Sequence, residues 1–177
     1  MTTMTLSYGK PRVVTIEEVK ELATRLTEQF MELGIEIPEN TTYEVSSKMT
    51  RCGGVCQISY ERNRYTRQPV EGSAVSVVRI NQFLAHEDLL SILAHEMLHA
   101  AVPFEHHGYG WLRLVNKVNR AYPEYNITTK LPGPVYRRMK ENTAAYKNPK
   151  SMVIGTGTIT TWEFNEQLVG SSACKVK

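Results

Sequence analysis

Two histidines and a glutamate lie close together in the middle of the chain, inside an apolar stretch. His95, Glu96 and His99 form the pattern His-Glu-x-x-His. Because residues four apart stand one turn above each other on an α-helix, the two imidazoles would share one helix face. Two neutral imidazoles at that spacing can bind Zn²⁺ together, and Glu96 beside them can reach a metal-bound water. The pattern therefore predicts a hydrolytic zinc centre.

A catalytic zinc ion needs a third protein ligand and an open fourth position. Two more histidines, His106 and His107, follow a short distance downstream. We expect a second amphipathic helix to begin near His107, which then lies one turn before the apolar Trp111 on the inward face. His106 is rotated by about a quarter turn from that face and is the weaker candidate. The sequence therefore predicts zinc bound by His95, His99 and His107.

Two helices are predicted to carry or support these side chains. Residues 89–101 contain no Gly or Pro and carry an apolar stripe, so we expect the helix of the His-Glu-x-x-His pattern there, with Asp88 as its cap. Nearer the N-terminus, apolar residues recur with helical spacing over residues 16–33. Thr15 opens this helix with a capping box, and Gly34 supplies its left-handed end.

The region between these two helices predicts a small antiparallel sheet. The apolar period shortens to two at residues 43–45, 55–60 and 74–80, which is typical of strands. Residues 61–69, between the last two strands, are polar and are interpreted as a hairpin loop. The order of helix, small sheet, His-Glu-x-x-His helix and second ligand-bearing helix predicts an α+β fold.

Residues 95–119 resemble the core of the SprT-like (Spartan-like) zinc metalloproteases. In that family His-Glu-x-x-His is followed by a His-Gly pair, by an aromatic residue four positions after that His, and by an Asn eight positions after the aromatic. The corresponding residues here are His107, Gly108, Trp111 and Asn119. Two upstream segments also resemble the family, namely Arg51-Cys52-Gly53-Gly54 and Arg79-Ile80-Asn81.

The resemblance implies a minimal zincin-type metalloprotease domain over residues 1–125. It implies a zinc-dependent endopeptidase that hydrolyses peptide bonds through a zinc-bound water, with Glu96 as general base, and that acts on DNA-associated proteins. Many relatives carry a C-terminal zinc ribbon with two cysteine pairs. Only Cys174 stands in that region here, so the resemblance does not extend to the ribbon.

Other interpretations of the same residues remain open. A zinc site of the gluzincin class would take Glu124 as its third ligand, whereas a metzincin would need Gly and His where the chain has Val102 and Glu105. Tyr109 or His106 could act as a second oxyanion donor, or both could be ordinary loop residues. The chain could also be a zinc-binding interaction module, for protein or nucleic acid, that does not turn over.

Composition agrees with a globular domain. The 177 residues are 41% hydrophobic, and no apolar run approaches the length of a membrane span. Residues 1–12 lack the apolar core of a signal peptide, and three cysteines cannot form a fully paired disulfide framework, so we expect a cytoplasmic or nucleoid-associated protein. Cys52 and Cys56 have no second Cys or His pair nearby, and we interpret them as small buried strand residues rather than metal ligands.

Basic side chains are concentrated in two segments. Residues 48–67 carry five basic side chains against one acidic, and residues 126–150 carry six against one, although the whole chain has a net charge of only +3. With tyrosines interleaved, the stretches Arg62–Arg67 and Arg137–Lys150 could bind nucleic acid, or they could be ordinary solvated surface. No membrane partner is expected.

Residues 126–177 are predicted to form an extension packed on the core. Residues 135–146 fit a short basic helix. Residues 151–164 fit a β-hairpin that turns at residues 155–157.

Overall fold

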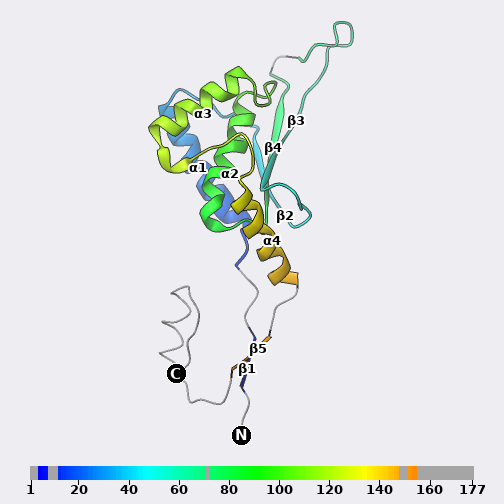
Figure 1. Ribbon diagram of the computed structural model, residues 1–177. Helices are drawn as coiled ribbons and strands as arrows, with labels where there is room; N and C mark the ends of the chain where they lie inside the picture. Colours follow the sequence, from blue (N-terminus) through cyan, green and yellow to red (C-terminus); the bar gives the residue numbers. More distant parts are fainter. Residues whose placement is uncertain (1–3, 8–11, 71, 148–150, 155–177) are drawn as a thin grey trace. The chain divides into compact units, whose positions relative to one another are not determined.

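The computed structural model describes residues 4–7, 12–70, 72–147 and 151–154 (Figure 1). The chain divides into one unit of residues 11–147 and a second unit drawn from both chain ends, residues 1–10 and 148–177. In the second unit, strand β1 (Met4–Ser7) pairs antiparallel with β5 (Ser151–Ile154). The predicted hairpin begins with a strand that is present as β5. Its turn at residues 155–157 and its second strand lie outside the described residues.

Helix α1 (Ile16–Glu32) begins and ends where the sequence predicts. The capping box is formed, because Thr15 Oγ1 accepts from the Glu18 backbone N at 3.3 Å and Glu18 Oε2 accepts from the Thr15 backbone N at 2.9 Å. After the helix, Gly34 has φ of +64°, which a residue without a Cβ adopts at little cost. The inward face of α1 is fully buried and consists of Val19, Ala23, Leu26 and Phe30.

A three-stranded sheet follows, with β4 (Val75–Asn81) between β2 (Thr42–Ser46) and β3 (Gly54–Ser59). β3 and β4 are antiparallel, as predicted for neighbours joined by a polar loop. β2 pairs with β4 in parallel, so the sheet is mixed, and the prediction of an all-antiparallel sheet is wrong. The alternation of apolar and polar residues in the sequence predicts which face of the sheet a residue occupies. It does not predict whether the neighbouring strand runs parallel or antiparallel.

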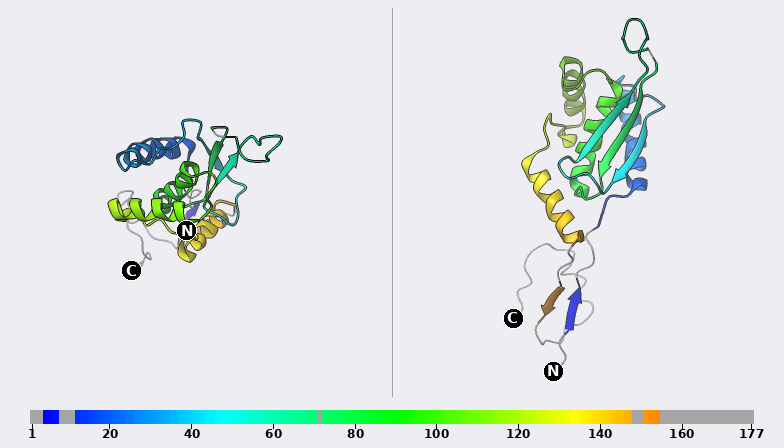
Figure 2. Two further views of the ribbon diagram at one scale, coloured as in Figure 1. Left: turned by 90° about the horizontal axis from the view of Figure 1, so that it is seen from above. Right: turned by 90° about the vertical axis from the view of Figure 1, so that its right-hand side faces the viewer.

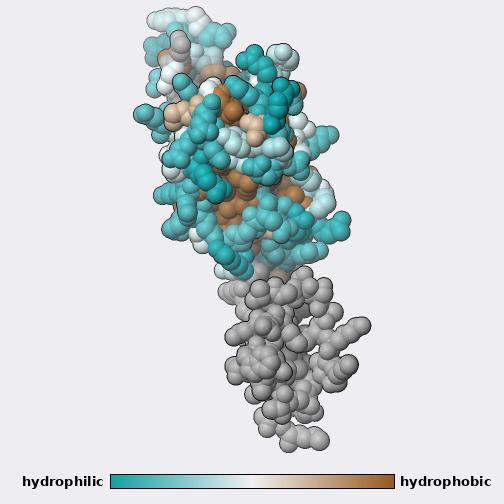
Figure 3. Space-filling model, turned by 90° about the vertical axis from the view of Figure 1, so that its left-hand side faces the viewer, coloured by the Kyte–Doolittle hydropathy of each residue, from teal (hydrophilic) through white to brown (hydrophobic). Residues whose placement is uncertain are grey.

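The helices cover one face of this sheet (Figure 2). Ser76, Val78 and Ile80 of β4 are buried beneath them. On the other face Arg79 Nε donates to Glu44 Oε2 at 2.8 Å, and both side chains are partly exposed. The surface seen from the side of α1 and α3 is mostly hydrophilic, with apolar side chains visible only in limited areas (Figure 3).

Three further helices complete the larger unit. α2 (His86–Ala101) carries the His-Glu-x-x-His pattern and α3 (Tyr109–Ala121) follows it, with a 3-10 turn, η1 (Pro123–Tyr125), after α3. α4 (Gly133–Lys147) confirms the predicted basic helix. None of the described helices combines the length and the apolar character that crossing a bilayer requires.

Two predicted helix boundaries need correction. α2 has Ala85 as its N-cap without a side-chain hydrogen bond, so Asp88 is not the cap. Asp88 instead lies in the first turn, where its carboxylate accepts from Arg138 Nε of α4 at 3.0 Å. α3 starts at Tyr109 with Gly108 as its N-cap, so His107 precedes the helix rather than opening it.

Candidate metal centre

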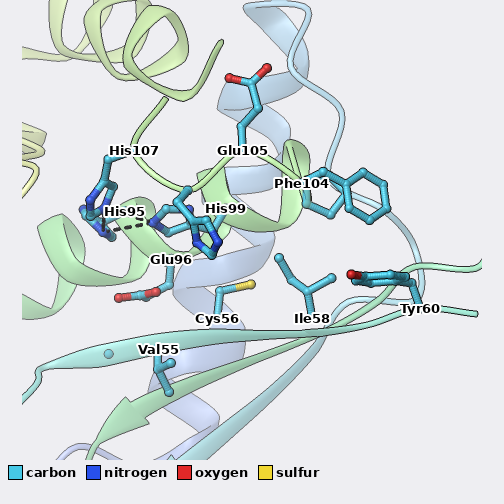
Figure 4. A pocket seen from close by; sticks show the side chains of 13 residues that line it. Val55, Cys56, Ile58, Tyr60, His95, Glu96, His99, Phe104, Glu105 and His107 are labelled. Carbon is cyan, nitrogen blue, oxygen red and sulfur yellow. Dashed lines mark hydrogen bonds between the residues drawn. The ribbon is translucent and has the colours of Figure 1, made fainter. Parts of the chain in front are cut away.

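The three histidines selected from the sequence lie together (Figure 4). His95 and His99 project from successive turns of α2, and His107 reaches them from the loop before α3. Their Nε2 atoms form a nearly equilateral triangle, with separations of 3.3 Å between His95 and His99, and 3.2 Å from each of these to His107. Within the described residues they are the group of ligand-type side chains close enough to share one ion.

Hydrogen bonding among the rings cannot account for all three sides of this triangle. A neutral imidazole has one N–H, and the Nδ1 of His95 is 2.8 Å from the backbone oxygen of Thr128, which can only accept. The His95 proton is therefore on Nδ1, and its Nε2 presents a lone pair to the other two rings. Ligands of a tetrahedral zinc ion at 2.0–2.1 Å would be separated by about 3.3 Å. The donor set and its spacing fit such an ion.

The outer nitrogens of two rings have backbone partners. His95 bonds the Thr128 carbonyl, and a ring nitrogen of His99 bonds the backbone of Glu105. The sequence predicts such partners to be carbonyls, glutamates or water, because the chain has a single Asp. Burial lowers the pKa of His95 to about 4, and burial together with the neighbouring histidines lowers the pKa of His99 to about 4. Both rings are thus neutral at pH 7, as metal ligation requires.

Glu96 projects from α2 toward β3, in the cleft below the rings (Figure 4). The residue is 8% exposed. Burial raises the pKa of Glu96 to about 7, while a hydrogen bond from the Cys56 backbone lowers it in part. The approach of β3 is close at Gly54, where a Cβ would lie 2.7 Å from Glu96 Cγ and 3.0 Å from Glu96 Oε1. Glycine at this position therefore leaves room for the carboxylate.

The indole of Trp111 packs against all three histidine rings. It is fully buried and lies with ring centroids 5.0 Å from His99, nearly parallel at 16°, and 4.8 Å and 4.5 Å from His95 and His107. Among the described residues its Nε1 is one of the buried polar atoms without a hydrogen-bond partner. An aromatic residue four positions after His107 therefore supports all three candidate ligands at once.

Glu105 holds the loop that carries His107. Its Oε2 accepts from the backbone N of Gly110 at 2.6 Å and of Trp111 at 3.3 Å, so a carboxylate caps the first turn of α3. A Cβ on Gly110 would collide with this carboxylate. Sequence reasoning did not identify this role of Glu105.

A cleft runs between α2 and β3, and His95 and His107 line it. On one side is a cavity of about 480 Å³, which extends past Ile58 to Tyr60 and Phe104, whose rings meet edge to face at 5.1 Å. On the other side is a cavity of about 190 Å³ bounded by residues 128–131. Both cavities are lined by Gly54, His95, Glu96 and His107.

The remaining candidate residues lie apart from the cluster. Glu124 is exposed on η1 and is not part of the ligand group, which disfavours a gluzincin arrangement. Tyr109 is 82% exposed, and His106, although it lines the larger cavity, is also exposed. Cys52 and Cys56 are free thiols outside the ligand group. Cys56 lies in β3 and is partly buried, and burial raises the pKa of its thiol to about 12. Cys52 is exposed and precedes β3, so its interpretation as a buried strand residue is wrong.

Two contributions to the site had no clear signal in the sequence. Thr128 acts through its backbone carbonyl, which any residue type would supply. Glu105 bonds a backbone N–H five residues away, and the sequence pattern of the intervening loop does not predict the shape of that loop. Asn119 stood out by its spacing from Trp111, but its partner, the backbone of Ile127, could not be identified.

Comparison with known proteins agrees with this geometry. The model of the SprT-like family matches residues 19–131, which include the sheet, α2, α3 and all three clustered histidines. No curated protein matches the chain. Because the family match spans more than half of its length, the chain belongs to the SprT-like family.

Proposed function

We propose that the protein is a zinc-dependent endopeptidase whose ligands are His95, His99 and His107 and whose general base is Glu96. The observation that carries this proposal is the triangle of Nε2 atoms 3.2–3.3 Å apart beside a buried carboxylate in a cleft. Membership of a family that is generally metalloprotease-like supports the same conclusion.

Zinc bound by these rings would act as a Lewis acid that lowers the pKa of water and polarises a peptide carbonyl. The chain supplies the proton transfers. A carboxylate oxygen of Glu96 accepts the proton of the attacking water and then delivers a proton to the leaving amine nitrogen. The Cys56 backbone hydrogen bond holds the carboxylate toward β3, and the Thr128 carbonyl holds the His95 ring.

The test is cleavage of an unfolded protein such as casein by zinc-loaded protein, with Glu96→Gln as the catalytic variant. We expect Glu96→Gln to retain zinc and to lose cleavage by about 10²-fold or more, because the amide cannot accept the proton. Glu124→Gln is the matched control, since Glu124 is exposed and lies outside the cluster. Undiminished cleavage by metal-loaded Glu96→Gln would refute the role of Glu96. Zinc binding without cleavage in the wild type would favour the interaction module.

We further propose that nucleic acid is a partner, and the loop between β3 and β4 supports this. Every described residue from 61 to 70 is exposed, and Tyr65 is 88% exposed. The tip is nevertheless ordered, since Asn63 Oδ1 accepts from the backbone N of Tyr65 at 2.9 Å and of Thr66 at 3.0 Å. It presents a ring and the guanidinium groups of Arg64 and Arg67 to solvent, a combination that suits stacking and phosphate contacts.

Binding to single-stranded DNA can be measured by fluorescence anisotropy at several salt concentrations. We expect Arg64→Glu with Arg67→Glu to weaken binding and to reduce the salt dependence, because fewer counterions are released. Arg113→Glu with Arg120→Glu on the exposed side of α3 is the control of equal charge change. Equal losses in both double variants would show that the loop has no specific role.

A further inference from the structure

The segment that follows η1 is hydrogen-bonded to α2 and α3 at three successive residues, the last of which bonds a ring of the metal centre. Ser91 Oγ donates to the backbone oxygen of Asn126 at 3.2 Å, and the backbone of Ile127 bonds the side chain of Asn119. The next carbonyl, that of Thr128, lies 2.8 Å from His95 Nδ1. Residues 126–128 therefore connect α3 to one of the three clustered rings.

Asn119 makes the most specific of these attachments. Its Nδ2 donates to the Ile127 oxygen at 2.9 Å and its Oδ1 accepts from the Ile127 nitrogen at 2.9 Å. One amide thus satisfies both polar groups of Ile127, as a neighbouring strand would. Ile127 is 3% exposed, so its backbone could not take equivalent bonds from solvent. The peptide unit that follows, with the Thr128 carbonyl one residue further on, is held in a fixed direction.

We propose that Asn119 is a positioning residue of the metal centre, because it holds Ile127 and thereby keeps the Thr128 carbonyl on His95 Nδ1. The carbonyl only accepts, so it keeps the proton on Nδ1 and turns the Nε2 lone pair toward His99 and His107. Asn119 touches neither the rings nor the cleft by any of these bonds and acts through the backbone. The inference deepens the proposed function and rests on it only where zinc is concerned.

The first test uses metal-free protein labelled with ¹⁵N-histidine. In the wild type we expect the His95 nitrogens to report one tautomer, with the proton on Nδ1. In Asn119→Ala we expect a mixture of tautomers, because the Thr128 carbonyl is no longer held. Asn116→Ala is the matched control, since Asn116 is an exposed residue of the same type on the same helix.

The second test measures zinc affinity by competition with a chromophoric chelator. Loss of an outer partner of a ligating histidine typically weakens metal binding by 10–100-fold, and we expect at least about tenfold for Asn119→Ala. Asn119→Asp, which keeps the acceptor for Ile127 N but loses the donor to Ile127 O, should show an intermediate loss. If Asn119→Ala does not fold, the zinc affinity of Asn119→Asp tests the proposal in its place.

Unchanged tautomers and unchanged zinc affinity in the Asn119 variants would overturn the proposal, even if their thermal stability fell. Losses of the same size in Asn116→Ala would also overturn it. Failure of the wild type to bind zinc would refute the proposed function alone, because the metal-free tautomer comparison still decides the role of Asn119.

Discussion

Two adjacent histidines before α3 differ in what they contact. Both are exposed, but it is His107 whose Nε2 lies 3.2 Å from the Nε2 atoms of His95 and His99. We expect His107→Ala to reduce zinc bound after dialysis by at least about tenfold, because a three-ligand site becomes a two-ligand one. His106→Ala should bind nearly as much zinc as the wild type. The opposite ranking would mean that the third ligand is misassigned.

Consecutive glycines at the start of β3 provide a second residue-level prediction. A Cβ at Gly54 would lie 2.7 Å from Glu96 Cγ and 2.9 Å from Ile92 Cγ2, whereas a Cβ at Gly53 would meet its nearest neighbours at 3.3–3.4 Å. Gly54→Ala should therefore displace Glu96 or β3 and lower the cleavage rate by about tenfold or more, with zinc retained. Gly53→Ala, assayed for rate and zinc content in parallel, should be affected much less. Equal rates for the two variants would contradict this account.

The candidate ligands could be predicted because their chemistry is local. His95 and His99 are four residues apart on a helix that apolar periodicity indicates, and His107 is one turn before Trp111. The orientation of His95 could not be predicted in this way. It depends on the hydrogen bond to the carbonyl of Thr128, 33 residues away. The position of that carbonyl depends in turn on the hydrogen bonds between Asn119 and the backbone of Ile127.

At the level of elements, α4 lies beyond the residues that match the family model but is packed into the same unit as the metal centre. Val135 and Met139 are buried, and Arg138 pairs with Asp88 at the start of α2. Asp88 is itself 8% exposed. The helix is therefore held in this unit by a buried apolar face, and it is joined to α2 by a bidentate ion pair.

Removing Arg138 should lower stability by leaving Asp88 buried and unpaired. We expect Arg138→Leu to reduce the melting temperature measured by circular dichroism, by clearly more than Arg137→Leu. The two arginines are neighbours, and Arg137 is exposed. A melting temperature that is equal in the two variants would show that the ion pair does not hold α4 in place.

For the sheet, the sequence predicts the positions of the strands but not all of their pairings. Period-two alternation located all three strands of the larger unit, and the polar loop predicted the antiparallel pairing of β3 with β4. The parallel pairing of β2 with β4 joins residues about 35 positions apart, such as Thr42 and Val77. No local pattern encodes such a pairing, because it is selected by how the sheet covers α1 and α2.

At the scale of the whole molecule, an ion in this centre would add a direct link between α2 and the loop that carries His107. Two candidate ligands belong to α2 and the third to the loop before α3. Since zinc would bind the folded chain, it should stabilise that state by about 2.7 kcal/mol at a free concentration a hundredfold above the dissociation constant.

Thermal unfolding with zinc and with a chelator checks this linkage. We expect a higher melting temperature with zinc in the wild type and in His106→Ala, and little or no difference in His99→Ala. A zinc-dependent increase that persists in His99→Ala would place the stabilising ion elsewhere in the molecule.

The indole of Trp111 lies against all three clustered rings and is shielded from solvent. Its emission should therefore respond to whatever fixes or protonates those rings, and a paramagnetic ion such as Co²⁺ in the same place should quench it. The molecule in this way contains its own optical reporter, and with Trp162 replaced by Phe the occupancy of the centre could be followed in real time without an added dye.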